Sequence, residues 1–309
     1  MLGARGMVGS ALVRSLRQRG YDVVEHAGRT LGCDLRNPDA AEAVLRGAQP
    51  AAVFLAAARV GGIGANSSRQ WDFLRDNLLI ALNCIDAAVR LGAHRFVFLG
   101  SSCIYPREAP QPLREEYLLG GPLEPTNRGY AVAKIAGVEL CRAWHDQHPG
   151  EAPRFVCPMP TNLYGPGDNF DLEGSHLVPA LVRKLVEARD AGAPEVTLWG
   201  TGTPRREVLH VDDCADAVVM LAEHDDPPLV VNVGCGEDLP VSALAERARQ
   251  AVGYGGRVRW DDSRPDGMPR KLLDVRWLRA MGWRPRIGLD EGLRATVEWY
   301  EAHREEARL

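Results

Sequence analysis

The sequence predicts an α/β fold built on a doubly wound parallel sheet, together with a smaller α/β lobe. Three observations lead to this fold class. Short apolar runs alternate with helical patterns through the first two thirds of the chain, as expected of parallel strands joined by right-handed crossovers. The runs at 51–57 and 95–99 are apolar almost throughout, which indicates strands buried on both faces. A glycine-rich turn at 3–9 leads directly into the first helical pattern.

The expected elements alternate as such a fold requires. Strands are expected at residues 21–25, 51–57, 95–99, 196–199 and 229–233. Helices are expected at residues 10–19, 39–46, 73–91, 127–145, 175–190, 212–223 and 242–252, with a last amphipathic helix from about residue 289. Segments rich in Gly, Pro, Asp and Asn are expected to be loops, and these lie at 165–174 and 264–271.

The bulk composition limits the possible functions. The 309 residues carry a net charge of −4, so neither a nucleic acid nor a membrane is the expected main partner. The seven cysteines are scattered and contain no CxxC pair, which favours reduced thiols in the cytoplasm over disulfides or a metal site. The longest apolar stretch, 51–58, is far shorter than the roughly 20 residues of a membrane span, and we do not expect a signal peptide.

Gly3, Gly6 and Gly9 form a G-x-x-G-x-x-G pattern at the head of this alternation. Glycines let the backbone approach a pyrophosphate, and the helix that follows presents free N–H groups to it. The pattern therefore predicts a Rossmann-type dinucleotide site. Arg5 and Arg29 are placed to clamp a 2′-phosphate, which favours NADP. Glu25 is the counterargument, because NAD enzymes place an acid at the end of the second strand.

The start of the chain does not fit the fold. Only Met1 and Leu2 precede Gly3, although a dinucleotide-binding sheet needs a full central strand here. Deleting a central strand would remove ladder hydrogen bonds and buried apolar surface from a marginally stable fold. We therefore expect the native product to begin several residues upstream of Met1, which the intact mass of natively expressed protein would test.

Tyr130 and Lys134 lie four residues apart on the helix expected at 127–145, and therefore on one face of it. Because an ammonium stabilises a phenolate, Lys134 is expected to lower the pKa of Tyr130 toward neutrality. Such a tyrosine can protonate a carbonyl oxygen as hydride reaches the carbon. The spacing alone is common and is often structural, but the serine-rich loop that begins at Ser101, after the strand at 95–99, favours a reductase centre.

Longer motifs around these residues resemble those of the GDP-L-fucose synthases, a family of extended short-chain dehydrogenases/reductases. The motifs are LGSSCIYP at 99–106, LEPTN at 123–127, YAVAKIAG at 130–137, MPTNLYGP at 159–166 and WGTGTPRRE at 199–207. The resemblance covers essentially the whole chain. It implies an NADPH-dependent conversion of GDP-4-keto-6-deoxy-D-mannose to GDP-L-fucose, by epimerisation at C3 and C5 and then reduction at C4. It also implies a homodimer, in which the helices at 73–91 and 127–145 could pair across a two-fold axis.

The resemblance also implies roles for the catalytic residues. Ser101 and Tyr130 would hold the substrate oxygen and assist hydride transfer, while Lys134 would anchor the nicotinamide ribose. Cys103 and His176 would exchange protons at C3 and C5, and their ordinary pKa values of about 8.5 and 6.5 suit this exchange. Taken alone, a cysteine in such a place is more often a packing residue, and such a histidine a helix cap.

Binding residues are carried over from the same resemblance. For the cofactor they are Gly3, Arg5, Gly6, Met7, Val8, Gly9, Arg29, Ala56, Asn77, Tyr130, Lys134, Pro160, Asn162, Leu163 and His176. For the nucleotide sugar, mainly its diphosphate, they are Asn162, Lys184, Arg206 and Lys271, with Val178 and Trp199 near the base. Asn77 would help to hold Lys134, directly or through a water molecule. Only three lysines occur in the chain, at 134, 184 and 271, and all three are in these sets.

Two parts of the chain are expected to divide this work. Residues 1–160, with about 205–233, would bind NADP, and about 161–204 with 234–309 would bind the nucleotide sugar. One residue departs from the expected pattern. Pro158 falls inside a strand expected near Phe155, and because proline cannot donate to a ladder, it is expected to shorten that strand or to mark a sheet edge.

Three other functions remain open from the sequence. An epimerase-reductase for another GDP-4-keto sugar, such as a deoxyheptose or colitose precursor, fits the same motifs, because loop residues choose the sugar. A 4-epimerase that resembles the UDP-galactose type would hold NAD and would not use Cys103 and His176. A non-catalytic NADP-sensing regulator would have little use for Ser101, Tyr130 and Lys134 together.

Overall fold

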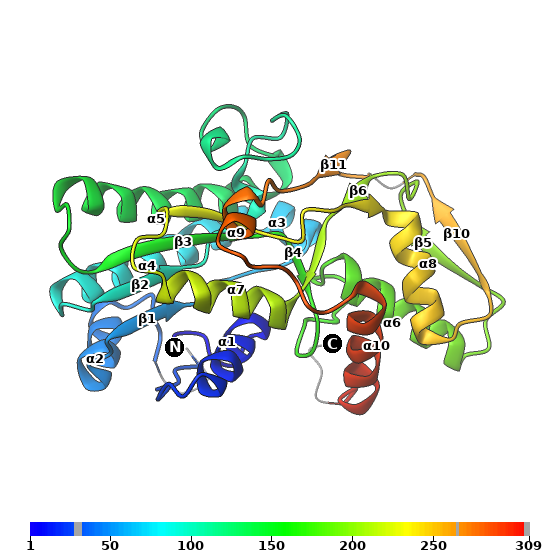
Figure 1. The fold of residues 1–309 in the computed structure, drawn as a ribbon. Helices are drawn as coiled ribbons and strands as arrows, with labels where there is room; N and C mark the ends of the chain where they lie inside the picture. Colours follow the sequence, from blue (N-terminus) through cyan, green and yellow to red (C-terminus); the bar gives the residue numbers. More distant parts are fainter. Residues whose placement is uncertain (28–32, 264–265, 306–309) are drawn as a thin grey trace.

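The computed structural model describes residues 1–27, 33–263 and 266–305. Its central element is a parallel sheet of four strands in the order β1-β2-β3-β8, seen on the left of Figure 1. The strands are β1 (Ala52–Leu55), β2 (Arg95–Phe98), β3 (Arg154–Pro160) and β8 (Val230–Val233). All residues of β2 are buried, and in β1 those from Val53 to Leu55 are buried, so the expectation that these two strands are covered on both faces is confirmed.

Helices cover both faces of this sheet (Figure 1). α4 and α5 contact each other, as do α1 and α7. Alternate side chains of β1 separate the two faces, because Val53 and Leu55 pack in the cluster that contains α4 and α5, whereas Phe54 packs with α1 and α7. The bounds are α1 (Met7–Gln18), α2 (Pro38–Ala48), α4 (Gln70–Arg90), α5 (Arg128–Gln147) and α7 (Val211–Glu223).

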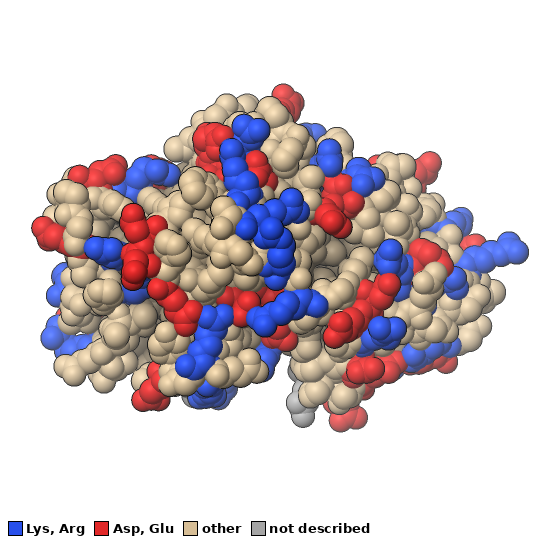
Figure 2. Space-filling model, viewed as in Figure 1, with Lys and Arg blue, Asp and Glu red and all other residues tan. Residues whose placement is uncertain are grey.

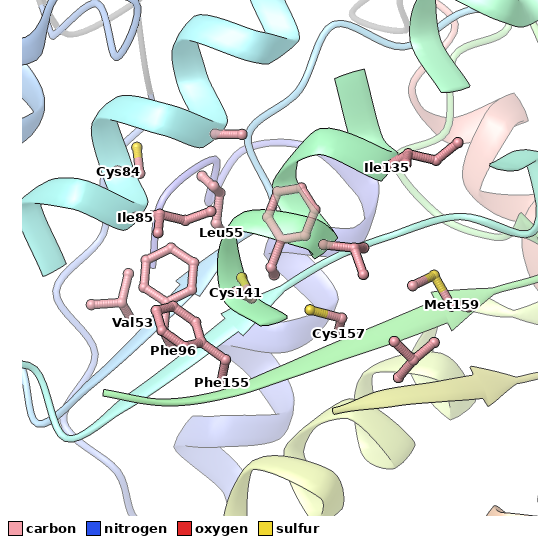
Figure 3. Packing of buried hydrophobic residues seen from close by; sticks show 14 of the residues in the cluster. Val53, Leu55, Cys84, Ile85, Phe96, Ile135, Cys141, Phe155, Cys157 and Met159 are labelled. Atoms are coloured by element: carbon pink, nitrogen blue, oxygen red, sulfur yellow. The ribbon is translucent and has the colours of Figure 1, made fainter. Parts of the chain in front are cut away.

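The core between the sheet and α5 is rich in aromatic and sulfur-containing side chains (Figure 3). The Phe96 and Phe155 rings lie 5.6 Å apart between centroids, tilted by 53°. The thiols of Cys141 and Cys157 are fully buried. Burial of each large apolar side chain stabilises the fold by about 1.5–3 kcal/mol. This packing fixes α5 against β2 and β3, and α5 holds Tyr130 and Lys134.

The later segments build a second group of elements, on the right of Figure 1. α6, α8 and α10 pack around a core of their own, and β5 pairs with β10 beside them. Shorter pairings, β4 with β7 and β6 with both β9 and β11, lie closer to the central sheet. The bounds are β4 (Asn162–Tyr164), α6 (Leu177–Asp190), β5 (Glu195–Trp199), β6 (Arg205–Arg206), β7 (Val208–His210), β9 (Leu239–Pro240), α8 (Val241–Val252), β10 (Arg257–Asp261), β11 (Arg270–Lys271) and α10 (Leu289–Ala302).

The expected helices are all present, with ends that differ from the expectation by less than one turn. The ends have local causes. At α2, for example, the Asn37 side chain accepts hydrogen bonds from the backbone N–H of Asp39 (2.8 Å) and Ala40 (3.2 Å), and Pro38 occupies the first helical position. Two short helices were not expected, α3 (Ile63–Ser68) and α9 (Arg276–Ala280). Single 3₁₀ turns lie at Ser102–Ile104, Glu115–Tyr117 and Pro125–Asn127.

The strand expected at 21–25 is wrong: these residues form no strand, and His26 alone bridges to Leu2. The Met1 ammonium donates to Val24 O (2.8 Å), and His26 N donates to Met1 O (2.9 Å). A strand requires a neighbouring strand, and the neighbours of this segment are only Met1 and Leu2. The ladder formed with Met1 and Leu2 is therefore too short to hold residues 21–25 as a strand.

Pro158 neither shortens its strand nor marks an edge, so that expectation is also wrong. β3 continues to Pro160 and lies between β2 and β8. The pairing of β2 with β3 ends at Val156, and that of β3 with β8 begins at Cys157. The missing N–H of Pro158 thus falls where β2 no longer pairs, although Gly100 N still donates to Pro158 O (2.8 Å). Beyond this point the chain after β2 turns away and forms the serine-rich loop.

Charged side chains of both signs are mixed on the face seen in Figure 2. Basic side chains form a band across the middle of this face, over α9, and acidic side chains lie among them. Arg276, in α9, pairs with Glu116 (3.3 Å), and Arg114 pairs with Asp274 (3.5 Å). This mixture agrees with the small net charge of −4. Among the described helices, none combines the length and the apolar character that crossing a bilayer demands.

Candidate active site

The glycine turn at the start of the chain makes a tight backbone cradle beside the end of β1. Gly3 has a φ of 89°, and a Cβ at this residue would lie 2.5 Å from Ala57 N. A Cβ on Gly9 would collide with the carbonyl oxygen of Gly3. α1 begins at Met7, so its free N–H groups border the turn and suit an anion. The cradle therefore fits the pyrophosphate of a dinucleotide, as the sequence predicts.

The other residues expected at the cofactor lie around the same end of the sheet. Met7 and Val8 form the first turn of α1, and Arg5 is exposed within the glycine turn. Ala56, Pro160, Asn162 and Leu163 stand at or just after the carboxyl ends of β1 and β3, an edge at which parallel sheets bind ligands. Arg29 lies outside the described residues.

The face of α5 brings Tyr130 and Lys134 to the carboxyl end of β2. Lys134 is buried, and its Nζ donates to Leu99 O (2.7 Å). The same ammonium lies 4.9 Å from the centre of the Phe98 ring and 5.9 Å from the centre of the Tyr130 ring. The expected helix spacing therefore places both side chains at the site, but it directs Lys134 toward the strand end.

Ser101 joins this pair from the loop after β2. Its Oγ accepts a hydrogen bond from Cys103 N (3.1 Å), which begins the 3₁₀ turn Ser102–Ile104. The Ser101 hydroxyl is also hydrogen-bonded to the Tyr130 side chain. Ser101 and Tyr130 thus offer two hydroxyl groups to one position, which is the arrangement expected for a carbonyl oxygen.

The pKa of Tyr130 does not follow the expectation. Burial and then the neighbouring Cys103 raise the pKa of the phenol well above its ordinary value, and the hydrogen bond to Ser101 offsets only part of this. Burial lowers the pKa of Lys134 to about 8. The ammonium donates to a backbone carbonyl, and desolvation is the largest effect on both groups. Tyr130 is therefore a neutral phenol that can give up a proton.

Asn77 holds a loop through three direct hydrogen bonds, none of which goes to Lys134. Its Oδ1 accepts from Arg59 N (2.7 Å), and its Nδ2 donates to Arg59 O (3.0 Å) and Phe73 O (2.8 Å). The buried amide therefore fixes the chain that follows β1, near the expected cofactor position.

Cys103 and His176 arrive at the site from different elements. Cys103 is on the turn after β2, and His176 precedes the first turn of α6. His176 is exposed, yet it stands among enough protein that burial, followed by the charge of Lys271, lowers its pKa. Its side chain makes no capping hydrogen bond, although it occupies the N-cap position. A capping role, which the sequence left open, therefore receives no support.

The thiol of Cys103 has an unexpected partner. Lys271 Nζ donates to Cys103 Sγ at 3.1 Å. Burial raises the pKa of this thiol, but Lys271, Ser101 and Arg206 together outweigh it, and the net pKa lies below the ordinary value. Cys103 is thus set in an electropositive, partly open environment of the kind that activates thiols.

The residues expected at the nucleotide sugar are only partly brought together. Lys184 Nζ lies 4.9 Å from the centre of the Trp199 ring, and Trp199 is 60% exposed. Arg206 donates to Arg205 O (2.8 Å), and its charge helps to lower the pKa of Cys103. Val178 is buried in the core of the second group of elements, so it shapes that core and does not offer an open surface.

Glu207 was missed by the sequence reasoning. The side chain is fully buried, and its two oxygens accept from Gly236 N (2.6 Å) and Leu273 N (2.9 Å). Burial raises its pKa to about 7, against the effect of these donors. The signal was a lone acid in the apolar run that follows Arg206. Asp266 was also missed: it accepts from Thr201 N (2.7 Å) and so ties the loop after β5.

The site therefore combines two kinds of chemistry at one sheet edge. A neutral phenol and a serine hydroxyl can polarise and protonate a carbonyl oxygen beside a dinucleotide cradle. A thiol of lowered pKa and a largely neutral imidazole can exchange protons on carbons that flank such a carbonyl. The first set fits a reductase, and the second fits an epimerase.

Comparisons with known proteins give relatives over almost the whole chain. The sequence profile of the NAD dependent epimerase/dehydratase family matches residues 1–234. The chain is 50% identical over 300 residues to a probable GDP-L-fucose synthase 1 of Oryza sativa subsp. japonica, covering 96% of this chain and 90% of that protein. It is 47% identical over 308 residues to the GDP-L-fucose synthase of Escherichia coli (strain K12), covering 96% and 94%.

A solved structure agrees with these relatives. The GDP-L-fucose synthetase of Naegleria fowleri bound to NADP superimposes with a TM-score of 0.91 at 25% identity, covering 100% of this chain and 95% of that one. The α/β fold with a parallel sheet predicted from the sequence is therefore confirmed.

Proposed function

Because the chain belongs to the NAD-dependent epimerase/dehydratase family, we propose that it is a GDP-L-fucose synthase that uses NADPH. Its substrate is GDP-4-keto-6-deoxy-D-mannose, which it epimerises at C3 and C5 and reduces at C4. The observation that supports this proposal most strongly is that reductase groups and epimerase groups lie together at one edge of the sheet. Ser101 and Tyr130 serve the reduction, and Cys103 with His176 serves the epimerisation.

Epimerisation comes first, because C3 and C5 are acidic only while C4 is a ketone. Ser101 and Tyr130 donate hydrogen bonds to the C4 oxygen and stabilise the enolate that forms there. Cys103 Sγ takes the proton from carbon, and the bonding pair moves toward the C4 oxygen. His176, once its imidazole has taken up a proton from solvent, delivers that proton to the opposite face of the same carbon. The substrate needs no oxidant or reductant in this step.

Reduction follows at C4. NADPH, when bound, supplies the hydride. Tyr130 gives its phenolic proton to the C4 oxygen, which suits a phenol that burial keeps protonated at neutral pH. Lys134 orients the nicotinamide ribose from the adjacent turn of α5. Ser101 keeps the oxygen in place through both steps, so the sugar need not leave the site between them.

NADPH is favoured over NADH for two reasons. The glycine cradle fits a pyrophosphate, and Arg5 projects from it into solvent, where a 2′-phosphate could be met. Glu25, the acid that would favour NAD, pairs with Arg17 at 2.6 Å. An acid engaged in this way is a poor acceptor for a ribose hydroxyl. The relative from Naegleria fowleri is a complex with NADP.

We propose that the nucleotide sugar binds against the second group of elements. We assign Asn162, Lys184, Trp199 and Arg206 to this ligand, with the two cations facing its diphosphate. Lys271 stands on the same side of the site. Accordingly, residues 1–160 with about 205–233 would bind NADP, and about 161–204 with 234–309 would bind the sugar nucleotide.

The protein is proposed to form a homodimer through α4 and α5. A mainly apolar groove runs between these helices and is lined by Leu78, Leu79, Ala81, Leu82, Ala136, Gly137, Glu139, Leu140 and Ala143. Leu82 is 49% exposed and Leu140 is 37% exposed. A second copy of the same face would cover both leucines. A reducing compartment, the cytoplasm, is proposed because the chemistry requires Cys103 as a free thiol.

Purified protein incubated with GDP-4-keto-6-deoxy-D-mannose and NADPH tests the proposal, with the product identified by NMR. The expected product is GDP-L-fucose, with deuterium at C3 and C5 when the reaction runs in D₂O. A product reduced at C4 without deuterium at C3 and C5 would refute the epimerase half. Binding of NADPH without its consumption, with this or other GDP-4-keto sugars, would favour the regulator instead.

A further inference from the structure

A role in binding the diphosphate does not explain why Lys271 is buried or why it contacts Cys103. Its side chain is largely buried, with 8% of its surface exposed, and its ammonium donates to Cys103 Sγ at 3.1 Å. A buried ammonium is costly unless an acceptor or an opposite charge meets it. The acceptor of the Lys271 ammonium is the sulfur of Cys103, and a neutral thiol is a weak hydrogen-bond acceptor. A thiolate is the better partner for this ammonium.

The charges around Cys103 have one sign. Lys271 from β11 and Arg206 from β6 both act on the thiol, and the hydroxyl of Ser101 donates to it as well. Tyr130, from α5, is neutral because its own pKa is raised. Desolvation opposes ionisation of the thiol, yet the two cations and the hydroxyl outweigh it. Burial and the charge of Lys271 lower the pKa of His176, the remaining titratable neighbour, so its imidazole must take up a proton before it can act as the acid.

The backbone of β11 is held firmly, so the position of Lys271 is not incidental. Lys271 pairs in register with Arg206, and Glu207 N donates to Lys271 O (3.2 Å). Two residues further on, Leu273 N donates to the buried carboxyl of Glu207 (2.9 Å). On the other side, Leu113 N donates to Leu272 O (2.7 Å). These hydrogen bonds fix the backbone of β11 and so direct the Lys271 side chain toward Cys103.

We propose that Lys271 is the charge partner that holds Cys103 as its thiolate, and that Glu207 is the positioning residue that keeps Lys271 there. The thiolate is the base that removes the proton from the sugar carbon: the carbon–hydrogen bond breaks, the sulfur–hydrogen bond forms, and the electron pair moves to the C4 oxygen. Lys184 and Arg206 remain for the diphosphate. The role in catalysis rests on the proposed function, whereas the thiolate itself does not.

The thiolate can be measured without any sugar. Iodoacetamide reacts with thiolates, so the rate of Cys103 carboxamidomethylation, followed by mass spectrometry of its peptide, reports the thiol pKa over about pH 5 to 10. In Lys271→Gln the apparent pKa of Cys103 is expected to rise by about one unit or more, which slows alkylation about tenfold at neutral pH. Lys271→Arg keeps the charge and is expected to keep most of the reactivity.

Arg270→Gln is the matched control, because it removes a cation from the same short strand. The Arg270 guanidinium is paired with Asp238 and does not contact the thiol. Alkylation of Cys103 in this variant is expected to match the parent protein. NADPH binding checks that each variant is folded. Alkylation rates that are equal in the parent and in folded Lys271→Gln would overturn the proposal.

A kinetic measurement separates this role from diphosphate binding. Lys271→Gln is expected to slow deuterium exchange at C3 and C5 at least about tenfold, with KM changed by less than about threefold. An increase of KM with unchanged exchange would make Lys271 a diphosphate ligand and would contradict the proposal. If the alkylation shift is seen but the parent protein turns over no GDP-4-keto sugar, the proposed function fails and the thiolate assignment stands.

Glu207→Gln tests the positioning role. It leaves Lys271 and Cys103 unchanged but removes one of the two acceptors that hold the chain around β11. We expect an alkylation rate between those of the parent and Lys271→Gln, and the double variant should react at the rate of Lys271→Gln alone, because Glu207 acts through Lys271. Additive effects of the two substitutions would show that Glu207 does not act through Lys271.

Discussion

The two sides of the site each contain a buried lysine, and the two lysines are held in opposite ways. Lys134 stands on α5, four residues from Tyr130, and its ammonium meets an uncharged backbone carbonyl. Lys271 stands on the two-residue strand β11 and meets a thiol that its charge favours in ionised form. Burial acts without a compensating anion at Lys134 and lowers its pKa to about 8. At Lys271 the thiol can supply that anion.

The difference separates a reductase side from an epimerase side. On the α5 side, desolvation keeps Tyr130 protonated, so that it is ready to give a proton. On the β11 side, positive charge lowers the pKa of Cys103 and so favours the thiolate, which can take a proton. One site can thus contain an acid and a base together, because each is tuned by a different structural element. Substitutions on each side should therefore have separable effects.

Tyr130→Phe should have the largest effect, and this effect should fall mainly on the reductase side. Loss of the proton donor is expected to slow NADPH oxidation by the sugar about 10³- to 10⁴-fold. NADPH binding, measured by fluorescence titration, should remain within a few-fold of the parent, and some deuterium exchange at C3 and C5 should persist through Ser101. Unchanged turnover would remove Tyr130 from the chemistry.

Cys103→Ala should damage the opposite side. Deuterium incorporation at C3 and C5, followed by NMR, is expected to slow about 10²- to 10³-fold because the base is gone. NADPH affinity should be unchanged. The comparison between the two sides breaks down if this variant still inverts both carbons, or if it loses cofactor binding to the same extent as exchange.

Lys134→Met should remove a pH dependence of stability. Because the native pKa of Lys134 lies near 8, below the ordinary 10.5, the native protein favours the neutral amine. The free energy of unfolding of the cofactor-free protein should therefore rise as the pH rises from about 8 to about 10.5, by up to about 3 kcal/mol. In Lys134→Met this rise should be absent, as urea titrations at a series of pH values would report. An equal rise in both proteins would assign it to another group.

Glu207→Gln should have the smallest effect, of about 1–3 kcal/mol on unfolding, because one buried N–H loses its acceptor. The sign of its pH dependence is opposite to that of Lys134. Burial raises the native pKa of Glu207 to about 7, so its protonated form is favoured in the fold, and this contribution is lost as the pH rises through about 7. Denaturation at pH 4.5, the ordinary pKa of a glutamate, and again above pH 7 measures it. A larger loss in the variant at high pH than at low pH would contradict the assignment.

The fold and the α5 side could be predicted from the sequence because their signals are local. The spacing of Tyr130 and Lys134 falls within one helix, and the glycines of the turn at 3–9 fall within one loop. The strand at 21–25 was predicted from composition but fails for want of a neighbour, since strand formation depends on a partner and not on the segment itself. Pro158 is tolerated because β3 changes its pairing partner beside it.

The β11 side could not be predicted in the same way. β6, β9 and β11 each contain two residues, which is too short for any periodic pattern. The contact of Lys271 with Cys103 depends on the tertiary arrangement of three such segments. Glu207, which ties them together, is marked in the sequence only as an acid within an apolar run. The resemblance to a family placed Lys271 near the ligand but gave no indication of the thiol.

The distance in sequence between Cys103 and Lys271 has a consequence for how the protein assembles. Tyr130 and Lys134 are neighbours as soon as α5 forms, whereas 168 positions separate Cys103 from Lys271. Closing so long a loop is slow compared with helix formation. The chain loses conformational entropy on closing the loop before the contact between Cys103 and Lys271 can stabilise it. During refolding, Cys103 should keep the sluggish reactivity of an ordinary thiol until β11 docks. The alkylation rate of Cys103, measured during refolding, would therefore report when β11 docks.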